Sequence, residues 1–260
     1  MSGFLETIVA HVEGVVEKSK AGVPLAEMRR RGEAVRVVRP FREALEAKPV
    51  AVIAEVKRAS PSKGDIALDL DAAKTARLYE EGGAAALSVL TEGTFFKGSL
   101  ADLQAARATV SLPVLRKEFI VDPYQLYETA AAGADAVLLI ARILEPSQLG
   151  DFMALASELH LETLVEVFDE ADIDKVTPFA PPLVGINNRN LASFDTDTTR
   201  AGRLGALLPS GTTVVAASGI KDATDIRRHL DAGISSFLVG ESLVRAKDTV
   251  GMLKELVSSE

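Results

Sequence analysis

Cysteine is absent from the 260-residue sequence, which excludes a disulfide framework, a cysteine nucleophile and a thiolate metal site. Histidine is scarce as well: His11, His160 and His229 lie far apart, and none has the spacing of metal ligands. We therefore expect no metal ion, and the chemistry of this chain has to come from other side chains.

Long apolar runs are also missing. No stretch approaches the ~20 residues that span a bilayer, and the N-terminus lacks the basic region and apolar core of a signal peptide. We expect a soluble, cytoplasmic protein that contacts no membrane. The formal net charge of −8 argues against nucleic acid as the main partner, although a local cluster of cations could still bind a small anion.

From residue 50 onward, short apolar runs alternate with amphipathic stretches. The runs, each typical of a buried strand, are Val50–Val56, Ala85–Leu90, Pro113–Phe119, Ala136–Ile140, Thr163–Phe168, Leu183–Asn187, Thr213–Ala217 and Phe237–Val239. The stretches between them carry helical periodicity, as in Ala72–Glu81, Pro123–Ala132, Pro146–Leu159 and Asp222–Ala232. This alternation predicts parallel strands with right-handed crossovers, and eight such units favour a closed (β/α)8 TIM barrel.

A glycine motif recurs where a helix gives way to a strand, at Gly82-Gly83, Gly133 and Gly233. Glycine in the left-handed conformation ends a helix, so the motif supports the repeat of helix and strand. A doubly wound open sheet is the alternative architecture. It is weakened because no Gly-x-Gly-x-x-Gly pattern follows the first strand.

The N-terminal part of the chain lies outside this repeat. Apolar residues at helical spacing predict one helix that includes Phe4 to Val16 and a second, shorter helix from Pro24 to Arg31. We expect residues 1–260 to form a single barrel domain, with residues 1–47 as its N-terminal helical extension.

Charged side chains interrupt the ends of the expected strands. Glu55 and Lys57 are two residues apart on the first strand, so their side chains point to the same side. Because the active site of such a barrel lies at the carboxyl ends of its strands, we expect the polar residues found there to form the site. They are Glu55, Lys57, Lys117, Glu166, Asn187, Arg189, Ser218, Gly219, Gly240 and Glu241. Lysine and glutamate in a partly buried cleft can have pKa values moved toward neutrality, which suits acid–base catalysis.

Glycine turns follow the last two strands. Ser218-Gly219 precedes a helix that starts near Asp222, and Gly240 opens a short helical turn. Glycine lets the backbone approach a ligand, and helix N-termini offer free N–H groups, so the two turns predict the usual phosphate site of such barrels. Phe96 and Phe119 lie in or beside the strand-end loops and either pack in the core or line a pocket for an aromatic substrate.

Several segments together resemble the indole-3-glycerol phosphate synthase family: Glu55–Gly64, Leu90–Glu92 with Phe96–Ser99, Leu115–Val121, Leu138–Ile140, Val165–Val167, Gly185–Leu191 and Val239–Leu243. The resemblance covers the whole chain. It implies a reaction of tryptophan biosynthesis without a cofactor, in which 1-(2-carboxyphenylamino)-1-deoxyribulose 5-phosphate is converted to indole-3-glycerol phosphate by ring closure, decarboxylation and dehydration. The implied partner is thus a small phosphorylated aromatic substrate, and association with other enzymes of the tryptophan pathway is left open.

The resemblance also implies roles for individual residues. Lys117 would be the general acid of ring closure, with Glu166 and Lys57 as the base and the acid of dehydration. Glu55 would hold the lysines. The remaining implied contacts are Asn187 and Arg189 with the substrate hydroxyls and carboxylate, Ser60, Ser218, Gly219, Gly240 and Glu241 with the substrate or its phosphate, and Phe96, Phe119 and Leu138 with the aryl group.

One position departs from the family pattern. The family usually has Ala-Glu-Ser-Gly at the seventh strand, whereas this chain has Ala216-Ala217-Ser218-Gly219, so a carboxylate is missing.

Three other functions are weighed against the resemblance. Phosphoribosylanthranilate isomerase shares the barrel but is expected to use a cysteine base, which is absent here. A Schiff-base aldolase would use Lys117 or Lys57 as its nucleophile. A non-catalytic binding barrel is disfavoured because Glu55, Lys57, Lys117 and Glu166 are all present.

Overall fold

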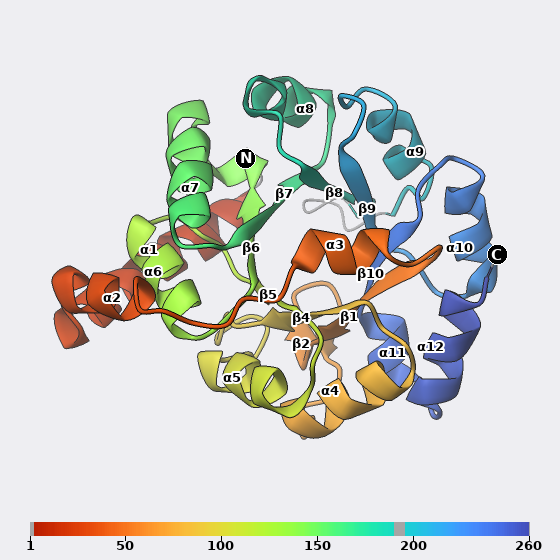
Figure 1. The fold of residues 1–260 in the computed structure, drawn as a ribbon, viewed down its shortest axis with the longest axis horizontal. Coiled ribbons are helices and arrows are strands. Elements are labelled where there is room, and N and C mark those ends of the chain that lie inside the picture. Colours follow the sequence, from red (N-terminus) through yellow and green to blue (C-terminus); the bar gives the residue numbers. More distant parts are fainter. Residues whose placement is uncertain (1–2, 190–195, 260) are drawn as a thin grey trace.

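The computed structural model describes residues 3–189 and 196–259. Within these residues, eight parallel strands close into one barrel (Figure 1). The strands are β1 (Ala51–Val56), β4 (Ala86–Leu90), β5 (Val114–Lys117), β6 (Ala136–Ile140), β7 (Glu162–Val167), β8 (Leu183–Asn187), β9 (Thr213–Ala217) and β10 (Ser236–Val239). The strand β1 pairs with both β4 and β10, which closes the sheet. The predicted (β/α)8 TIM barrel is confirmed, and the doubly wound alternative is wrong.

Helices connect the strands and cover the outside of the barrel (Figure 1). They are α4 (Ala72–Glu81), α5 (Leu100–Thr109), α6 (Pro123–Ala131), α7 (Pro146–Glu158), α8 (Glu170–Val176), α9 (Arg200–Gly205), α10 (Ala223–Leu230), α11 (Glu241–Arg245) and α12 (Thr249–Val257), with 3-10 turns η1 (Ala141–Ile143) and η2 (Thr177–Phe179). Gly83, Gly133 and Gly233 have φ values of 91°, 86° and 78°, so the glycine motif does mark left-handed helix ends.

Aspartate or serine side chains fix where many of these helices begin. Each accepts a hydrogen bond from a backbone N–H of the first turn, which would otherwise lack a partner inside the helix. The capping residues are Asp71, Ser99, Asp122, Asp169, Asp222 and Asp248. The loops at the carboxyl ends of β1, β4, β5, β7 and β9 therefore end at defined positions, which helps to place the residues they carry.

The strand β5 is shorter than the apolar run Pro113–Phe119 from which it was predicted. It ends at Lys117, so this lysine lies at the end of the strand and not inside it. The carboxylate of Glu118 accepts hydrogen bonds from the Phe119 N–H at 2.9 Å and from the Thr91 hydroxyl at 2.6 Å. Because the Phe119 N–H donates to the side chain of Glu118, it forms no hydrogen bond to a neighbouring strand.

A small hairpin was not predicted. It consists of β2 (Ala59–Ser60) and β3 (Gly64–Asp65), and it shapes the loop that follows β1. The tight turn at its tip places Gly64 at a φ of 64°, which glycine adopts without strain.

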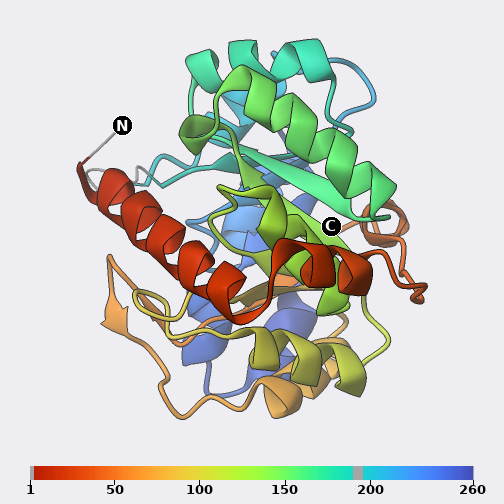
Figure 2. The same ribbon diagram turned by 90° about the vertical axis from the view of Figure 1, so that its left-hand side faces the viewer.

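The N-terminal segment contains α1 (Gly3–Gly22), α2 (Leu25–Gly32) and α3 (Phe41–Glu46). Figure 1 shows α3 lying across the barrel opening, where Phe41 N and Arg42 N donate to the Glu162 carboxylate of β7 at 2.5 Å and 3.0 Å. Figure 2 shows the start of α1 at the end that carries the β2–β3 hairpin. The segment thus packs against both ends of the barrel.

Candidate active site

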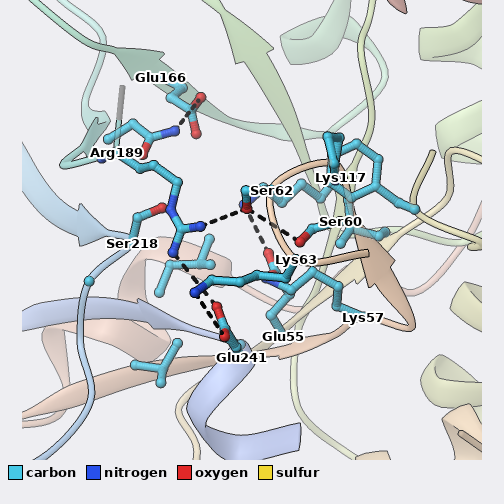
Figure 3. A pocket seen from close by; sticks show the side chains of 18 of the residues that line it. Glu55, Lys57, Ser60, Ser62, Lys63, Lys117, Glu166, Arg189, Ser218 and Glu241 are labelled. Carbon is cyan, nitrogen blue, oxygen red and sulfur yellow. Dashed lines mark hydrogen bonds and ion pairs between the residues drawn. The ribbon is translucent and has the colours of Figure 1, made fainter. Parts of the chain in front are cut away.

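A cavity of about 330 Å³ opens at the carboxyl ends of the strands. Every residue that the sequence suggested for the site lines it: Glu55, Lys57, Ser60, Phe96, Lys117, Phe119, Leu138, Glu166, Asn187, Arg189, Ser218, Gly219, Gly240 and Glu241. The parallel strands bring these residues together from positions spread over most of the sequence. Figure 3 shows many of their side chains around one space.

Glu55 lies between two ammonium groups. Its carboxylate is 2.7 Å from Lys57 Nζ and 2.8 Å from Lys117 Nζ, and its side chain is only 2% exposed. Burial opposes ionisation of this carboxyl, but the charges of Lys117 and Lys57 outweigh it and hold the pKa of Glu55 at about 2. The predicted proximity of Glu55 and Lys57 is therefore a buried ion pair, and Lys117 extends it across the barrel.

The proton affinities of Lys117 and Glu166 are both raised. Burial alone would lower the pKa of Lys117, but Glu55 and Glu166 supply negative charge and raise it above its usual range. Burial raises the pKa of Glu166, which Lys117 and the Asn187 amide only partly oppose. The expected move toward neutrality therefore holds for Glu166 and is wrong for Lys117, because two carboxylates face this lysine.

Asn187 joins Glu166 to the loop after β8. Its amide nitrogen donates to Glu166 Oε1 at 3.3 Å, and its oxygen accepts from the Arg189 backbone N–H at 3.0 Å. Because the two strands β7 and β8 are neighbours in the sheet, this amide sets the orientation of the carboxylate relative to the loop.

Arg189 reaches across the cavity mouth toward the hairpin (Figure 3). Its guanidinium donates to Ser62 Oγ at 2.7 Å and lies 3.7 Å from the Glu241 carboxylate. Lys63 and Arg245 also face Glu241, at 3.7 Å and 3.4 Å. Three cations thus gather around one carboxylate beside Gly240, and the net charge of this corner is positive.

Glycine suits the two turns for different physical reasons. Ser218 and Gly219 have φ values of 69° and 83°, so the chain turns sharply after β9 in a conformation that suits glycine. At Gly240 the reason is space, because a Cβ atom would lie 2.5 Å from Glu55 Oε1 and 3.1 Å from Lys57 Nζ. Gly240 therefore lets the buried carboxylate of Glu55 pack against the backbone.

One wall of the cavity is apolar. The rings of Phe96 and Phe119 lie 6.0 Å apart, and Leu138 lines the same cavity. The helix α1 adds Phe4, Leu5 and Ile8. Both phenylalanines therefore border the cavity, so the reading as core packing alone does not hold.

Several lining residues were missed from the sequence. Ser62 and Lys63 fall inside the segment that carried the resemblance, and Arg245 lies one helical turn after Glu241, so all three positions carried a usable signal. The α1 residues were recognised as an apolar helical face, but a periodic pattern does not say which surface that face covers.

Ala217, the position that departs from the family pattern, faces this site. It is in register with Asn187 of β8 and Leu238 of β10, and both of these residues line the cavity. Residues in register on neighbouring parallel strands share a face, so a longer side chain at position 217 would point toward the cavity.

Neither a candidate metal site nor a candidate membrane span occurs among the described residues. Between residues 3 and 189 and between 196 and 259, no group of three or more histidine, cysteine, aspartate or glutamate side chains is placed to hold a metal ion. In the same ranges, no helix has the length and apolarity needed to cross a membrane.

Comparison with known proteins gives a consistent result. A family model described as indole-3-glycerol phosphate synthase matches residues 5–256. A protein of that name from Desulfosudis oleivorans is 50% identical over 263 residues, covering all of both chains. Those from Rhodopirellula baltica and Aromatoleum aromaticum are 46% and 45% identical, each covering 98% of this chain and 99% of the relative. The chain belongs to the indole-3-glycerol phosphate synthase family.

Proposed function

We propose that this protein converts 1-(2-carboxyphenylamino)-1-deoxyribulose 5-phosphate to indole-3-glycerol phosphate, carbon dioxide and water, acting as a carboxy-lyase in tryptophan biosynthesis. The observation that carries the proposal is the buried Glu55 carboxylate between Lys57 and Lys117, next to an apolar wall and a cationic corner. Family membership supplies the substrate, and the cavity supplies the chemistry that each step needs.

Ring closure requires an acid. The aryl carbon that bears the carboxylate attacks the ribulosyl carbonyl, and the carbonyl oxygen takes up a proton to become a hydroxyl. The raised pKa of Lys117 keeps it charged, so it holds a proton for this step. Loss of carbon dioxide then restores the aromatic ring and needs no further group.

Dehydration requires an acid and a base. We assign Lys57 as the acid that protonates the leaving hydroxyl and Glu166 as the base that removes the ring proton. Burial raises the pKa of Glu166, which makes its carboxylate a stronger base than an exposed one. Glu55 holds both lysines and stabilises the positive charge that develops, while Asn187 orients Glu166.

Substrate contacts follow the two sides of the cavity. Phe96, Phe119 and Leu138 bind the aryl group on the apolar side. Asn187 and Arg189 contact the hydroxyls and the carboxylate, and Ser60 contacts the substrate or its phosphate. The phosphate lies at Ser218, Gly219, Gly240 and Glu241, through the backbone N–H groups of the last three, with Lys63 and Arg245 nearby to balance its charge.

The phosphate position can be tested separately. We expect a crystal soaked in sulfate to show the anion within hydrogen-bond reach of the Gly219 and Gly240 backbones. An anion bound elsewhere on the barrel rim, with these two turns empty, would contradict this assignment.

A Schiff-base aldolase is the weaker alternative. Attack on a carbonyl requires a neutral amine, and the neighbouring carboxylates raise the pKa of Lys117, which keeps it protonated. Borohydride added during turnover should therefore leave the protein mass unchanged.

The test of the main proposal is direct. Because the chain contains no tryptophan, the indole product is read by fluorescence against a low background. We expect the purified protein to release one carbon dioxide and one water per substrate, seen as the mass of the product. Intact substrate after prolonged incubation would overturn the proposal.

A further inference from the structure

Glu92 lies just after β4 and does not line the cavity, yet its side chain is only 3% exposed. Its carboxylate accepts three consecutive backbone N–H groups, from Thr94 at 2.7 Å, Phe95 at 2.6 Å and Phe96 at 3.0 Å. Hydrogen bonds to an ionised acceptor are stronger than neutral ones. One side chain therefore fixes the path of residues 92–96.

The same carboxylate faces the N-terminal helix. His11 of α1 places Nε2 3.7 Å from Glu92 Oε1 and 2.8 Å from Thr94 Oγ1. Phe95 meets α1 as well, because its ring stands edge-on to Phe4 at 5.8 Å and to His11 at 5.5 Å. The segment that Glu92 fixes is thus the surface on which the first half of α1 rests.

Phe96, the residue that follows Phe95, lines the cavity. Its ring lies 6.0 Å from the ring of Phe119. Since α1 contributes Phe4, Leu5 and Ile8 to the same cavity, both the aromatic wall and the helix above it depend on the placement of one short segment.

We infer that Glu92 and His11 are positioning residues for the substrate. Glu92 holds Phe96 against the aryl group and, together with His11, holds α1 over the cavity. The inference rests on the proposed function for its ligand. Neither residue lines the cavity, so their loss weakens the binding of substrate and transition state alike, which raises KM and leaves kcat nearly unchanged.

The test uses three variants: Glu92→Gln, His11→Gln and the double variant. The matched control is Glu13→Gln, which changes an exposed carboxylate on α1, the helix that carries His11. Backbone hydrogen exchange is first measured without any ligand. We expect Glu92→Gln to speed exchange about tenfold both in residues 92–97 and in residues 4–12, since the loss of a charge-assisted bond costs about 1.4 kcal/mol. His11→Gln should also speed exchange in both segments, because coupling between two sites is reciprocal.

Kinetics provide the second measurement. We expect Glu92→Gln to raise KM roughly tenfold with kcat within about threefold of the wild type, and the double variant to add little, since the two residues share one interaction. Glu13→Gln should match the wild type in both measurements. A fall in kcat at unchanged KM would overturn the inference.

Two further outcomes are decisive. Faster exchange confined to residues 92–97, with α1 unchanged, would reduce Glu92 to the support of a local turn and overturn the coupling. If Glu92→Gln does not fold, His11→Gln decides alone, since its side chain is 35% exposed on an outer helix. A wild type without turnover would count against the proposed function, whereas the exchange experiment contains no substrate and still tests the coupling.

Discussion

Glu55 balances the charge of the cavity at the level of single residues. Its carboxylate lies within 2.8 Å of two ammonium groups and can neutralise only one of them, and Glu166 supplies a second negative charge that faces Lys117. A buried pair of this kind costs desolvation energy that mutual attraction only partly offsets. We interpret the arrangement as one kept for reactivity, because it holds a proton beside the position proposed for the substrate carbonyl.

Replacement of Lys117 tests the assigned acid. We expect Lys117→Ala to lower kcat by on the order of 10²- to 10⁴-fold, since loss of a general acid costs about that much. Lys74→Ala, on the exposed face of α4, is the matched control and should retain full turnover. Circular dichroism should show the same fold for both variants. Turnover of Lys117→Ala within a few-fold of the wild type would remove Lys117 from the mechanism.

Position 217 tests the effect of the missing carboxylate. We expect Ala217→Glu to move the alkaline limb of the pH profile of kcat up by roughly half a pH unit to one unit, because a further negative charge favours protonated lysine. The shift should be modest, since Glu55 and Glu166 already raise the pKa of Lys117. Superimposable profiles with equal turnover would mean that alanine here is a packing residue, which its burial also permits.

At the scale of elements, the loops after β1 and β4 are fastened to each other. Arg58 donates to both oxygens of Asp102 on α5, at 2.6 Å and 2.8 Å, and to the carbonyl of Leu70 at 2.8 Å. A bidentate arginine–carboxylate pair fixes orientation as well as distance. The hairpin that bears Ser60 and the loop that bears Phe96 are thereby held in register with the strand ends.

Removal of α1 tests its contribution to substrate binding. We expect a chain without residues 1–22 to show a KM raised about tenfold or more, because Phe4, Leu5 and Ile8 no longer cover the cavity. The deletion also exposes surface that Val12 and Val16 cover, so the unfolding midpoint should be measured alongside. A soluble truncated protein that binds substrate as tightly as the full chain would contradict this role for α1.

The elements were predicted unevenly from the sequence, for a physical reason. Strand and helix positions follow from periodicity, which is a local property, and they agree with the structure to within a few residues. The end of β5 differs because a side-chain hydrogen bond of Glu118 competes with the sheet. The β2–β3 hairpin was missed because its strands are two residues long and carry no periodic signal.

At the scale of the whole molecule, acid stability should reflect Glu55. Its pKa of about 2 in the folded state lies below the value of about 4.3 in an unfolded chain. The ionised Glu55 carboxylate therefore stabilises the folded state fully at pH values above about 4.3, and this stabilisation is lost as the pH falls toward 2. Glu166 has the opposite effect on stability, because burial raises its pKa in the folded state. Its contribution to the free energy of unfolding is present at low pH and is lost as the pH rises through that raised pKa.

Urea unfolding between about pH 2 and pH 5 measures this effect. We expect the free energy of unfolding of the wild type to fall with pH by up to about 1.4 kcal/mol per pH unit from this one group, and Glu55→Gln to show a shallower slope. Glu43→Gln, an exposed carboxyl for which the slope should stay unchanged, serves as the control. Equal slopes for all three proteins would show that Glu55 does not govern acid unfolding.

The sequence predicted which residues lie in the cavity better than it predicted the side-chain contacts that connect the surrounding loops and helices. Polar residues at strand ends could be assembled from the sequence because a parallel barrel places all carboxyl ends of its strands on one side. Contacts such as those of Arg189 with Ser62 and of His11 with Glu92 could not be predicted from the sequence, because each pair joins loops or helices that are far apart in the chain. Such contacts depend on the tertiary packing of elements, which no local pattern specifies.

The pairing of the first strand with the last has a consequence for synthesis on the ribosome. Residues 51–54 of β1 lie beside residues 236–239 of β10, and Gly240 at the end of β10 provides the space for the Glu55 carboxylate. A nascent chain that has not reached residue 236 therefore has an open sheet edge at β1, and such edges invite pairing with other chains. The Glu55 carboxylate, made early, acquires its final surroundings only when translation is nearly complete.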